Sequence, residues 1–328
     1  MSRSWRAADL KSKPMNRRGR QPGHRTSIRM SRRAAAIDPG KIENSGIMLK
    51  NTFCHMPGVG ERLERNLWGS GILSWDCLGG EPQPVKHVHL KSLLAESVSE
   101  LSKGNPRYFA DLLPAREHWR LFTEFRDSTA YLDIETNGLG GPGACITTIS
   151  LYDGKSIYCY VKGKNLDDFK ADIKKYNVLV TFNGRCFDIP FIESYLGIHI
   201  DHAHIDLRFV LKDLGFAGGL KNCEKKLGLE RGDLDGVDGY FAVLLWKEFK
   251  RNKNQKALET LLAYNILDVI NLEPLMVVAY NLKLAGTPFQ KSHRLPMPLS
   301  PEPPFKADAR TIKKIFRAHS YRYATHPD

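Results

Sequence analysis

The sequence is poor in cysteine, and its few cysteines are not spaced for a structural role. Six are scattered through the 328 residues without a single C-x-x-C pair. This spacing excludes a zinc ribbon and the dense disulfide framework of small secreted domains. We therefore expect a protein of a reducing compartment, the cytoplasm.

Long apolar runs are also missing. No uninterrupted apolar stretch reaches the roughly 20 residues that cross a bilayer, and the N-terminal region lacks the apolar centre of a secretory signal. Hydrophobic residues at 42% and charged residues at 26% are instead typical of a soluble globular protein. A membrane partner is not expected.

Acidic residues are scarce in the first part of the chain. Residues 1–46 hold twelve Lys or Arg against three Asp or Glu, a balance of +9 out of the formal +13 of the whole chain. This segment also lacks apolar periodicity, so it is predicted to be disordered. It is a basic arm that grips phosphates, an Arg-rich transit peptide, or sequence upstream of a natural start at Met48. The remaining +4 does not by itself indicate a nucleic-acid partner.

Residues 47–80 are predicted to form a small helical segment around a glycine turn. The turn Pro57-Gly58-Val59-Gly60 lies between two short helical patterns and resembles a helix-hairpin-helix motif. In such a motif the backbone N–H groups at Gly58 and Gly60 bind a phosphate of nucleic acid. A purely structural helix turn explains the same residues.

The rest of the chain divides into a linker with helices (81–127), an α/β domain (128–286) and a Pro-rich, basic tail (287–328), whose last part, from Lys306, is either a short helix followed by a frayed end or frayed throughout. We expect the helices of the linker region, one of which is predicted from Pro114 to about Arg126, to pack against the α/β domain. Five strands are predicted in that domain: one that ends at Glu135, a hairpin of 145–152 and 156–161, a buried strand at 177–182, and a short one within 198–206. The hairpin makes the sheet mixed. Flanking helices are predicted at 165–176, 188–196, 207–214, 219–227, 240–250 and 257–284.

Two acids end the first strand. Because successive strand side chains point to opposite faces, Asp133 and Glu135 share one face, and the break at Thr136-Asn137-Gly138 puts them at the carboxyl end. Two adjacent like charges repel, and a divalent cation with oxygen ligands neutralises them. A half-exposed strand with two solvated acids is the alternative.

Two further acids follow later elements. Asp188 comes after the buried strand and at the start of a helix, where it is either a capping acid or part of a site at the carboxyl edge of the sheet. Asp268 rides the long apolar helix one turn after Tyr264, on the same face. A carboxylate in so apolar a helix is costly unless it is paired or bound to a metal.

Other polar residues have ordinary explanations. His199, His202 and His204 lack the helical i, i+4 spacing of a zinc site, so structural roles are expected. The basic run Lys247–Lys256 is either a solvated helix end or a contact to a phosphate backbone.

Three motifs in order, DIETNGL, NGRCFD and YNILD, carry these acids. Together they resemble the DEDD (DnaQ-like) superfamily of 3′–5′ exonucleases on a ribonuclease H-like fold, in its Tyr-containing branch. More closely, LVTFNGRCFDIPFI, HIDL and GGLKNCEKKLGLERG resemble the YprB-like ribonuclease H-like domain. The resemblance covers about Met48 to Leu284.

The resemblance implies hydrolysis of phosphodiesters with two divalent cations, Mg²⁺ or Mn²⁺. It implies that Asp133 bridges the two ions, that Glu135 and Asp268 complete the site of the ion that carries the attacking water, and that Asp188 serves the second ion. Tyr264 would orient the nucleophile. Such a two-ion arrangement stabilises the attacking and the leaving oxygen.

The implied substrate is a single-stranded DNA or RNA end, with Asn183 forming a hydrogen bond near the substrate strand. Neither sugar type is favoured by the residues, and protein partners are not indicated. The alternatives are a catalytically silent nucleic-acid-binding module on the same fold, a docking protein, and a structure-specific endonuclease or transposase.

Overall fold

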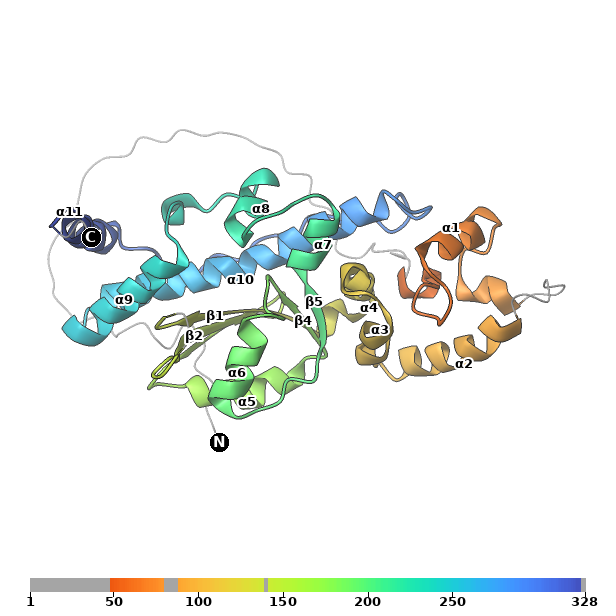
Figure 1. Cartoon of the computed structure of the whole chain (residues 1–328), viewed down its shortest axis with the longest axis horizontal. Helices are drawn as coiled ribbons and strands as arrows, with labels where there is room; N and C mark the ends of the chain where they lie inside the picture. Colours follow the sequence, from red (N-terminus) through yellow and green to blue (C-terminus); the bar gives the residue numbers. More distant parts are fainter. Residues whose placement is uncertain (1–47, 80–87, 139–140, 326–328) are drawn as a thin grey trace, which may run out of the picture.

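The computed structural model describes residues 48–79, 88–138 and 141–325. The predictions for the basic segment 1–46, and for the first part of the linker, lie outside these residues. Within them, one five-stranded sheet is flanked by helices on both faces (Figure 1). The predicted α/β class with a mixed sheet is confirmed.

The sheet has the strand order β3-β2-β1-β4-β5. Its strands are β1 (Thr129–Thr136), β2 (Ile146–Tyr152), β3 (Ile157–Val161), β4 (Val178–Thr181) and β5 (Ala203–Asp206). β1, β2 and β3 pair antiparallel, whereas β4 runs parallel to both β1 and β5. The centre of the sheet therefore holds two parallel neighbours, β1 and β4, whose carboxyl ends meet at the same edge.

Each face of the sheet is covered by its own helices. In the described part of the chain the α-helices are α1 (Glu61–Gly69), α2 (Val88–Ser102), α3 (Pro106–Leu112), α4 (Phe122–Phe125), α5 (Phe169–Asp172), α6 (Asp188–Leu196), α7 (Leu207–Asp213), α8 (Leu220–Lys226), α9 (Gly239–Asn252), α10 (Gln255–Leu284) and α11 (Ala309–Thr325). Helices α5 and α6 cover one face of the sheet, and α10 with its neighbours α7 and α9 covers the other (Figure 1).

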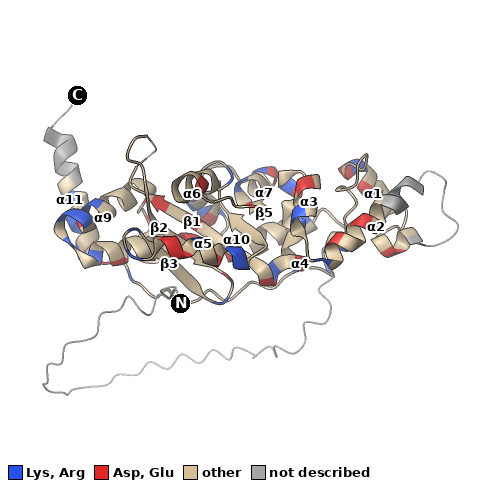
Figure 2. Cartoon of the chain, turned by 90° about the horizontal axis from the view of Figure 1, so that it is seen from below, with Lys and Arg blue, Asp and Glu red and all other residues tan. Residues whose placement is uncertain are grey.

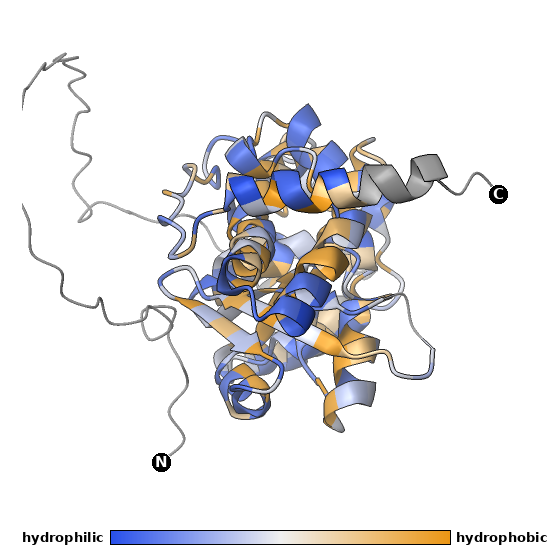
Figure 3. Cartoon of the chain, turned by 90° about the vertical axis from the view of Figure 1, so that its left-hand side faces the viewer, coloured by the Kyte–Doolittle hydropathy of each residue, from blue (hydrophilic) through white to orange (hydrophobic). Residues whose placement is uncertain are grey.

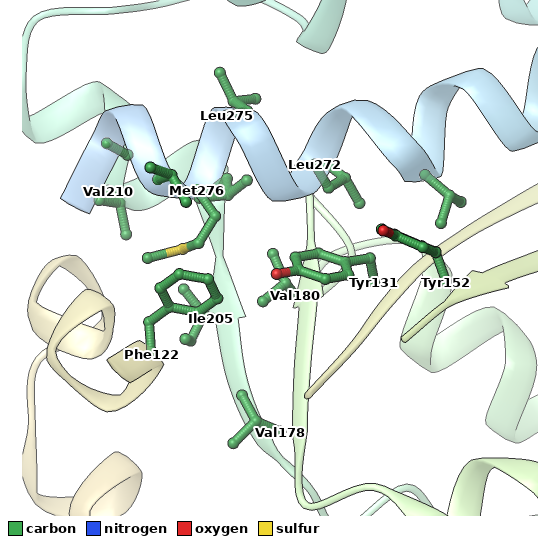
Figure 4. Packing of buried hydrophobic residues seen from close by; sticks show 14 of the residues in the cluster. Phe122, Tyr131, Tyr152, Val178, Val180, Ile205, Val210, Leu272, Leu275 and Met276 are labelled. Atoms are coloured by element: carbon green, nitrogen blue, oxygen red, sulfur yellow. The ribbon is translucent and has the colours of Figure 1, made fainter. Parts of the chain in front are cut away.

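The long helix α10 forms the centre of the larger core. Its Leu272 and Met276 point toward Tyr131 and Val180 of the sheet, whereas Leu275 points to the opposite side of the helix (Figure 4). By length and composition α10 could cross a membrane, but 89% of its most apolar window is buried inside the protein. It is apolar all round because the sheet and other helices surround it, as in a buried core helix.

The N-terminal segment, residues 48–79 and 88–128, packs against the sheet domain. One continuous core contains residues from both, among them Phe53, Trp119 and Ile205. This confirms the prediction made for the helices of the linker region. The buried ring of His118 bonds the carbonyl oxygen of His204 on β5 through Nδ1, at 2.7 Å. These contacts attach the segment to the far edge strand.

The predicted pair of helices around the glycine turn was partly wrong. Only α1 follows the turn as an α-helix, and the element before it is a four-residue 3₁₀ helix, Met48–Asn51. Gly58 adopts the left-handed conformation, with φ of 82°, which explains the glycine at that position of the turn.

Two predicted single helices are broken into short turns. The stretch 165–176 is 3₁₀ at Leu166–Asp168, α-helical at Phe169–Asp172 and 3₁₀ again at Ile173–Lys175. Asn165 does not cap it, because its side-chain amide bonds the backbone of Val161 and Cys159 at 2.8 and 2.9 Å. The predicted helix from Pro114 to about Arg126 is likewise a 3₁₀ helix, Ala115–Leu121, followed by α4.

The C-terminal region is more ordered than a tail. Residues 294–308 contain no helix or strand, but α11 then runs for 17 residues beside α9. Phe316 of α11 stacks on Phe241 of α9 with ring centroids 4.5 Å apart. This contact places the end of the described chain next to the sheet domain.

Candidate active site

Four acidic side chains from three separate segments meet at the carboxyl edge of the two central strands. β1 contributes Asp133 and Glu135 from one face, as their alternation requires. Asp188 opens α6, which follows β4, and Asp268 lies on α10 above the sheet. The parallel pairing of β1 with β4 explains why Asp188 meets the acids of β1, from which it is separated by more than 50 positions.

The geometry of this cluster is tight. One carboxylate oxygen each of Asp133, Glu135 and Asp268 lie within 4.8 Å of one another. Asp188 joins them by accepting the backbone N–H of Ile134 at 3.1 Å. All four acids line one cavity of about 640 Å³. The same cavity is lined by Tyr264.

The loop between β4 and α6 is held in one unusual conformation. Asn183 has a positive φ of 66°, and Asp206 fixes it by accepting the N–H of Asn183 at 2.7 Å and that of Arg185 at 3.1 Å. A side chain at Gly184 would come within 2.6 Å of Thr181 Cβ, so only glycine fits there. The loop therefore presents Asn183 to the cavity and places Asp188 at the cluster.

The cluster carries more negative charge than its surroundings favour. Burial, with the neighbouring carboxylates, raises the pKa of Asp133 and of Glu135 well above the ordinary range. Burial likewise raises the pKa of Asp188 to about 7. Such shifts arise when like charges share a poorly solvated site, and a bound cation would reverse them.

Asn265 holds Asp133 in place. Its Nδ2 donates to Asp133 Oδ2 at 2.7 Å, while its Oδ1 accepts from the hydroxyls of Thr148 at 3.1 Å and Ser150 at 2.8 Å. These two hydroxyls fix which end of the amide faces Asp133. Sequence reasoning missed this role, although Asn265 stands inside the YNILD motif, next to Tyr264.

A buried arginine faces Asp268. Arg231 bonds Asp268 through Nη2 and Glu224 through Nη1, the latter at 2.7 Å, and Glu224 also accepts from Asn271 at 2.8 Å. The guanidinium lies 5.6 Å from the ring centroid of Tyr264, and the ammonium of Lys221 lies 4.6 Å from it. These cations offset part of the charge of the cluster. The sequence offered only their place in GGLKNCEKKLGLERG as a signal.

Not every predicted site residue reaches this cavity. Gly58 and Gly60 are exposed and do not line the cavity that Asn183 lines. They belong to the N-terminal segment, which lies beside the β5 edge of the sheet in Figure 1. The buried His204 forms a hydrogen bond between its Nε2 and Thr181 Oγ1 at 2.8 Å. His202 forms one between its Nε2 and the carbonyl oxygen of Ile173 at 3.0 Å. The histidines thus have the structural surroundings that were expected.

The residues present fit a divalent cation. The donor set is made only of carboxylate oxygens, which Mg²⁺ and Mn²⁺ prefer. Three of these oxygens lie close enough to one another to bind a single ion. A cation there would relieve the repulsion that raises the carboxyl pKa values. Asp133, Glu135 and Asp268 would hold it, with Asp188 available for a second.

Comparison with known proteins agrees with this architecture. Residues 130–280 match the family model of the RNase_H superfamily. This stretch has a ribonuclease H-like fold. The match begins at β1 and ends within α10, so it covers all four acids and Tyr264. The ribonuclease H-like domain leaves α11 and the N-terminal segment outside it.

Among solved structures, the family B DNA polymerase from the hyperthermophilic archaeon Pyrobaculum calidifontis is similar over 51% of this chain and 27% of the polymerase chain. The sequence identity is 13% and the TM-score is 0.38. The chain thus matches about a quarter of the length of that polymerase. No curated protein matches the chain.

Proposed function

We propose that the protein is a metal-dependent 3′–5′ exonuclease of the DEDD type that hydrolyses phosphodiester bonds of single-stranded nucleic acid. One observation carries this: four acids from distant segments of a ribonuclease H-like domain line a single cavity, with three carboxylates close enough to share one ion. A cavity of about 640 Å³ is large enough for a terminal nucleotide.

The residues of the chain have separate tasks in this reaction. The oxygen of a water attacks phosphorus, the bond from phosphorus to the 3′ oxygen breaks, and a proton passes to that oxygen. Divalent cations held by the acids would offset the negative charge that develops on the phosphodiester. Asn265 fixes Asp133 for this purpose, and the loop at Asn183 provides an amide for the substrate strand.

Tyr264 acts as a hydrogen-bond donor in this proposal. Burial, with Asp268 and Glu135 nearby, raises the pKa of Tyr264 well above its ordinary value. The phenol therefore keeps its proton at neutral pH. It can orient the attacking water by donating to it, but it cannot serve as the general base.

Finer assignments rest on the sequence alone. They are the YprB-like subfamily, a cytoplasmic location, a pair of Mg²⁺ or Mn²⁺ ions, and phosphate binding by the turn at Gly58 and Gly60. Since that turn lies away from the cavity, it would contact a distant part of the nucleic acid.

The test is degradation of 5′-labelled single-stranded DNA and RNA with the 3′ end free or chemically blocked, in Mg²⁺, Mn²⁺ or EDTA. We expect shortening from a free 3′ end that needs a cation and stops in Asp133→Asn and Asp268→Asn. Asp127→Asn is the matched control, because that carboxylate is fully exposed. Activity that persists in both cavity variants refutes the site, and metal-independent binding without cleavage would show a silent binding module.

A further inference from the structure

Two helices far apart in the sequence place rows of cations side by side. α9 exposes Lys247, Lys250 and Arg251, spaced i, i+3, i+4 on one face. α11 exposes a longer row at i, i+3, i+4 and i+7, made of Arg310, Lys313, Lys314 and Arg317. Both helices lie at the same end of the molecule, where basic residues appear on each (Figure 2).

Between the helices lies a small cleft of about 210 Å³. Lys247 and Arg251 line it from α9 and Lys314 from α11, over the apolar side chains of Leu244 and Ile315. Figure 3 looks onto this end of the molecule, where the helix that leads to the C-terminus crosses the surface and alternates between hydrophilic and hydrophobic residues. The apolar side holds α11 to α9, and the basic side faces the cleft and solvent.

Few acids compensate these cations. Glu248 pairs with Lys314 at 2.9 Å and also accepts from Asn252 at 2.6 Å. Among the described residues, none forms an ion pair with Lys247, Arg251, Arg310, Lys313 or Arg317 at 4.0 Å or closer. The cleft therefore carries an uncompensated positive charge.

Helix stability does not explain this arrangement. Cations in the last turn of α9 favour that helix, because they face the negative end of its dipole. The row on α11 begins at its second residue, where the dipole disfavours cations, and like charges at i, i+3 and i+4 repel one another. A polyanion bound across both rows would remove these penalties.

The cleft adjoins the active site, because the two share a lining residue. Lys247 lines both the cleft and the cavity that holds the four acids, and Tyr240 of α9 lines that cavity as well. We infer that the cleft between α9 and α11 binds the phosphate backbone of the nucleic-acid strand that extends out of the catalytic cavity. This inference rests on the proposed function, and it adds a helix that lies outside the ribonuclease H-like domain.

The experiment compares the full chain with the variant Arg251→Gln, Lys314→Gln, Arg317→Gln. A matched control removes three cations elsewhere, Lys155→Gln, Lys170→Gln, Lys174→Gln, so that both variants have the same net charge. Fluorescence anisotropy in EDTA measures the affinity for a long single-stranded oligonucleotide as a function of salt, and cleavage of a dinucleotide in Mn²⁺ measures the catalytic cavity alone.

We expect the cleft variant to bind the long strand at least about tenfold more weakly, with the slope of log affinity against log salt reduced by about 2, or roughly 0.7 for each lost phosphate contact. Dinucleotide cleavage should stay at the wild-type level, and the control variant should match the wild type in both assays. An unchanged affinity and slope in the cleft variant, or an equal loss in the control, overturns the inference. Binding to anionic lipid vesicles is measured for the same variants. If the cleft variant loses more affinity for the vesicles than for the oligonucleotide, the inference is overturned too. Absence of metal-dependent cleavage in the wild type would instead contradict the proposed function.

Discussion

Two groups of buried charges contact α10, and they are built in opposite ways. The catalytic cavity gathers four acids around a few cations. The second group, near the N-terminal segment, is balanced: Arg120 pairs with Glu64 at 2.9 Å and Glu117 at 2.8 Å, and Lys283 of α10 pairs with Glu117 at 2.8 Å. Glu64 also accepts the N–H groups of Phe53 and Cys54.

The difference separates a stabilising network from a functional one. In the balanced network every charge has a partner and a defined hydrogen bond, so removing one member leaves another buried and unpaired. In the cavity the acids repel one another, so the fold gains nothing from having all of them charged. An arrangement that opposes folding persists where it serves binding or catalysis.

The largest expected effect is on catalysis, from Asp133→Asn. Because this change removes a cluster carboxylate and keeps its shape, we expect activity to fall by about 10³-fold, as for loss of a main electrostatic group. The unfolding free energy in EDTA should stay equal or rise, since one like charge is gone. Nuclease assays measure the loss of activity, and urea denaturation measures the unfolding free energy. A large loss of stability would show that the cavity resembles the balanced network after all.

The reverse is expected for Arg120→Met. The substitution leaves Glu64 buried without its cation and Glu117 with Lys283 alone, which should cost about 3–5 kcal/mol of unfolding free energy. Urea denaturation followed by circular dichroism measures it. Arg116→Met is the control, because that exposed ion pair with Glu61 is worth at most about 1 kcal/mol. Equal losses in the two variants would contradict the contrast drawn between buried and exposed pairs.

Asn265→Ala should produce an intermediate effect on the cavity. Without the amide that fixes Asp133, we expect Mn²⁺ affinity to weaken by about 10–100-fold, as for other groups that orient a metal ligand. Isothermal titration with Mn²⁺ measures this directly. Asn271→Ala is the matched control, since among the described residues that buried amide on the same helix bonds Glu224 and none of the four acids. Similar Mn²⁺ affinities in both variants would refute a positioning role for Asn265.

The smallest expected effect is the pH dependence of the metal-free protein. The raised pKa of Asp188, about 7, means that the folded chain keeps a proton that the unfolded chain releases near pH 4. The protonated Asp188 therefore adds to the unfolding free energy at low pH, and this contribution is lost as pH rises through about 7. Relative to Asp188→Asn, the wild type should lose a few degrees in Tm between pH 5 and pH 8, since about 1 kcal/mol shifts Tm by about 2–4 °C in chains of comparable size.

Asp188→Asn is the reference for the wild-type Tm, because other groups change the stability with pH in the opposite direction. Burial lowers the pKa of His55 to about 4 and that of His204 to about 3, so both favour the folded chain at higher pH. At pH 8, Mn²⁺ should raise the Tm of the wild type more than it raises the Tm of Asp188→Asn. A constant difference in Tm across pH would show that Asp188 does not hold the proton.

The sequence could predict the elements of the site but not its connections. The alternation of Asp133 and Glu135 and the spacing of Tyr264 and Asp268 are local periods, so each strand or helix could be predicted with its facing residues. The contact of Asn265 with Asp133 spans 132 positions. It depends on how α10 crosses β1 and β2, and no local pattern encodes that crossing.

Two predictions from the sequence differ from the structure for the same reason. The stretch 165–176 has helical spacing, but Asn165 bonds β3 instead of capping a helix. The C-terminal region is predicted as a basic tail with at most a short helix, yet the 17-residue α11 packs on α9 through Phe316 and Phe241. In both cases a tertiary partner decided the outcome, and propensity alone could not reveal it.

By itself the sequence determined the α/β class, the position of the acids on their elements and the absence of a cysteine framework, since these follow from residue type and period. Only the tertiary structure decided that the acids share one cavity, that Asn265 orients one of them and that α9 and α11 form a basic cleft beside it. The physical reason is that the electrostatic energy of a charge depends on its distance from other charges and on its burial, and both are set by packing between distant segments.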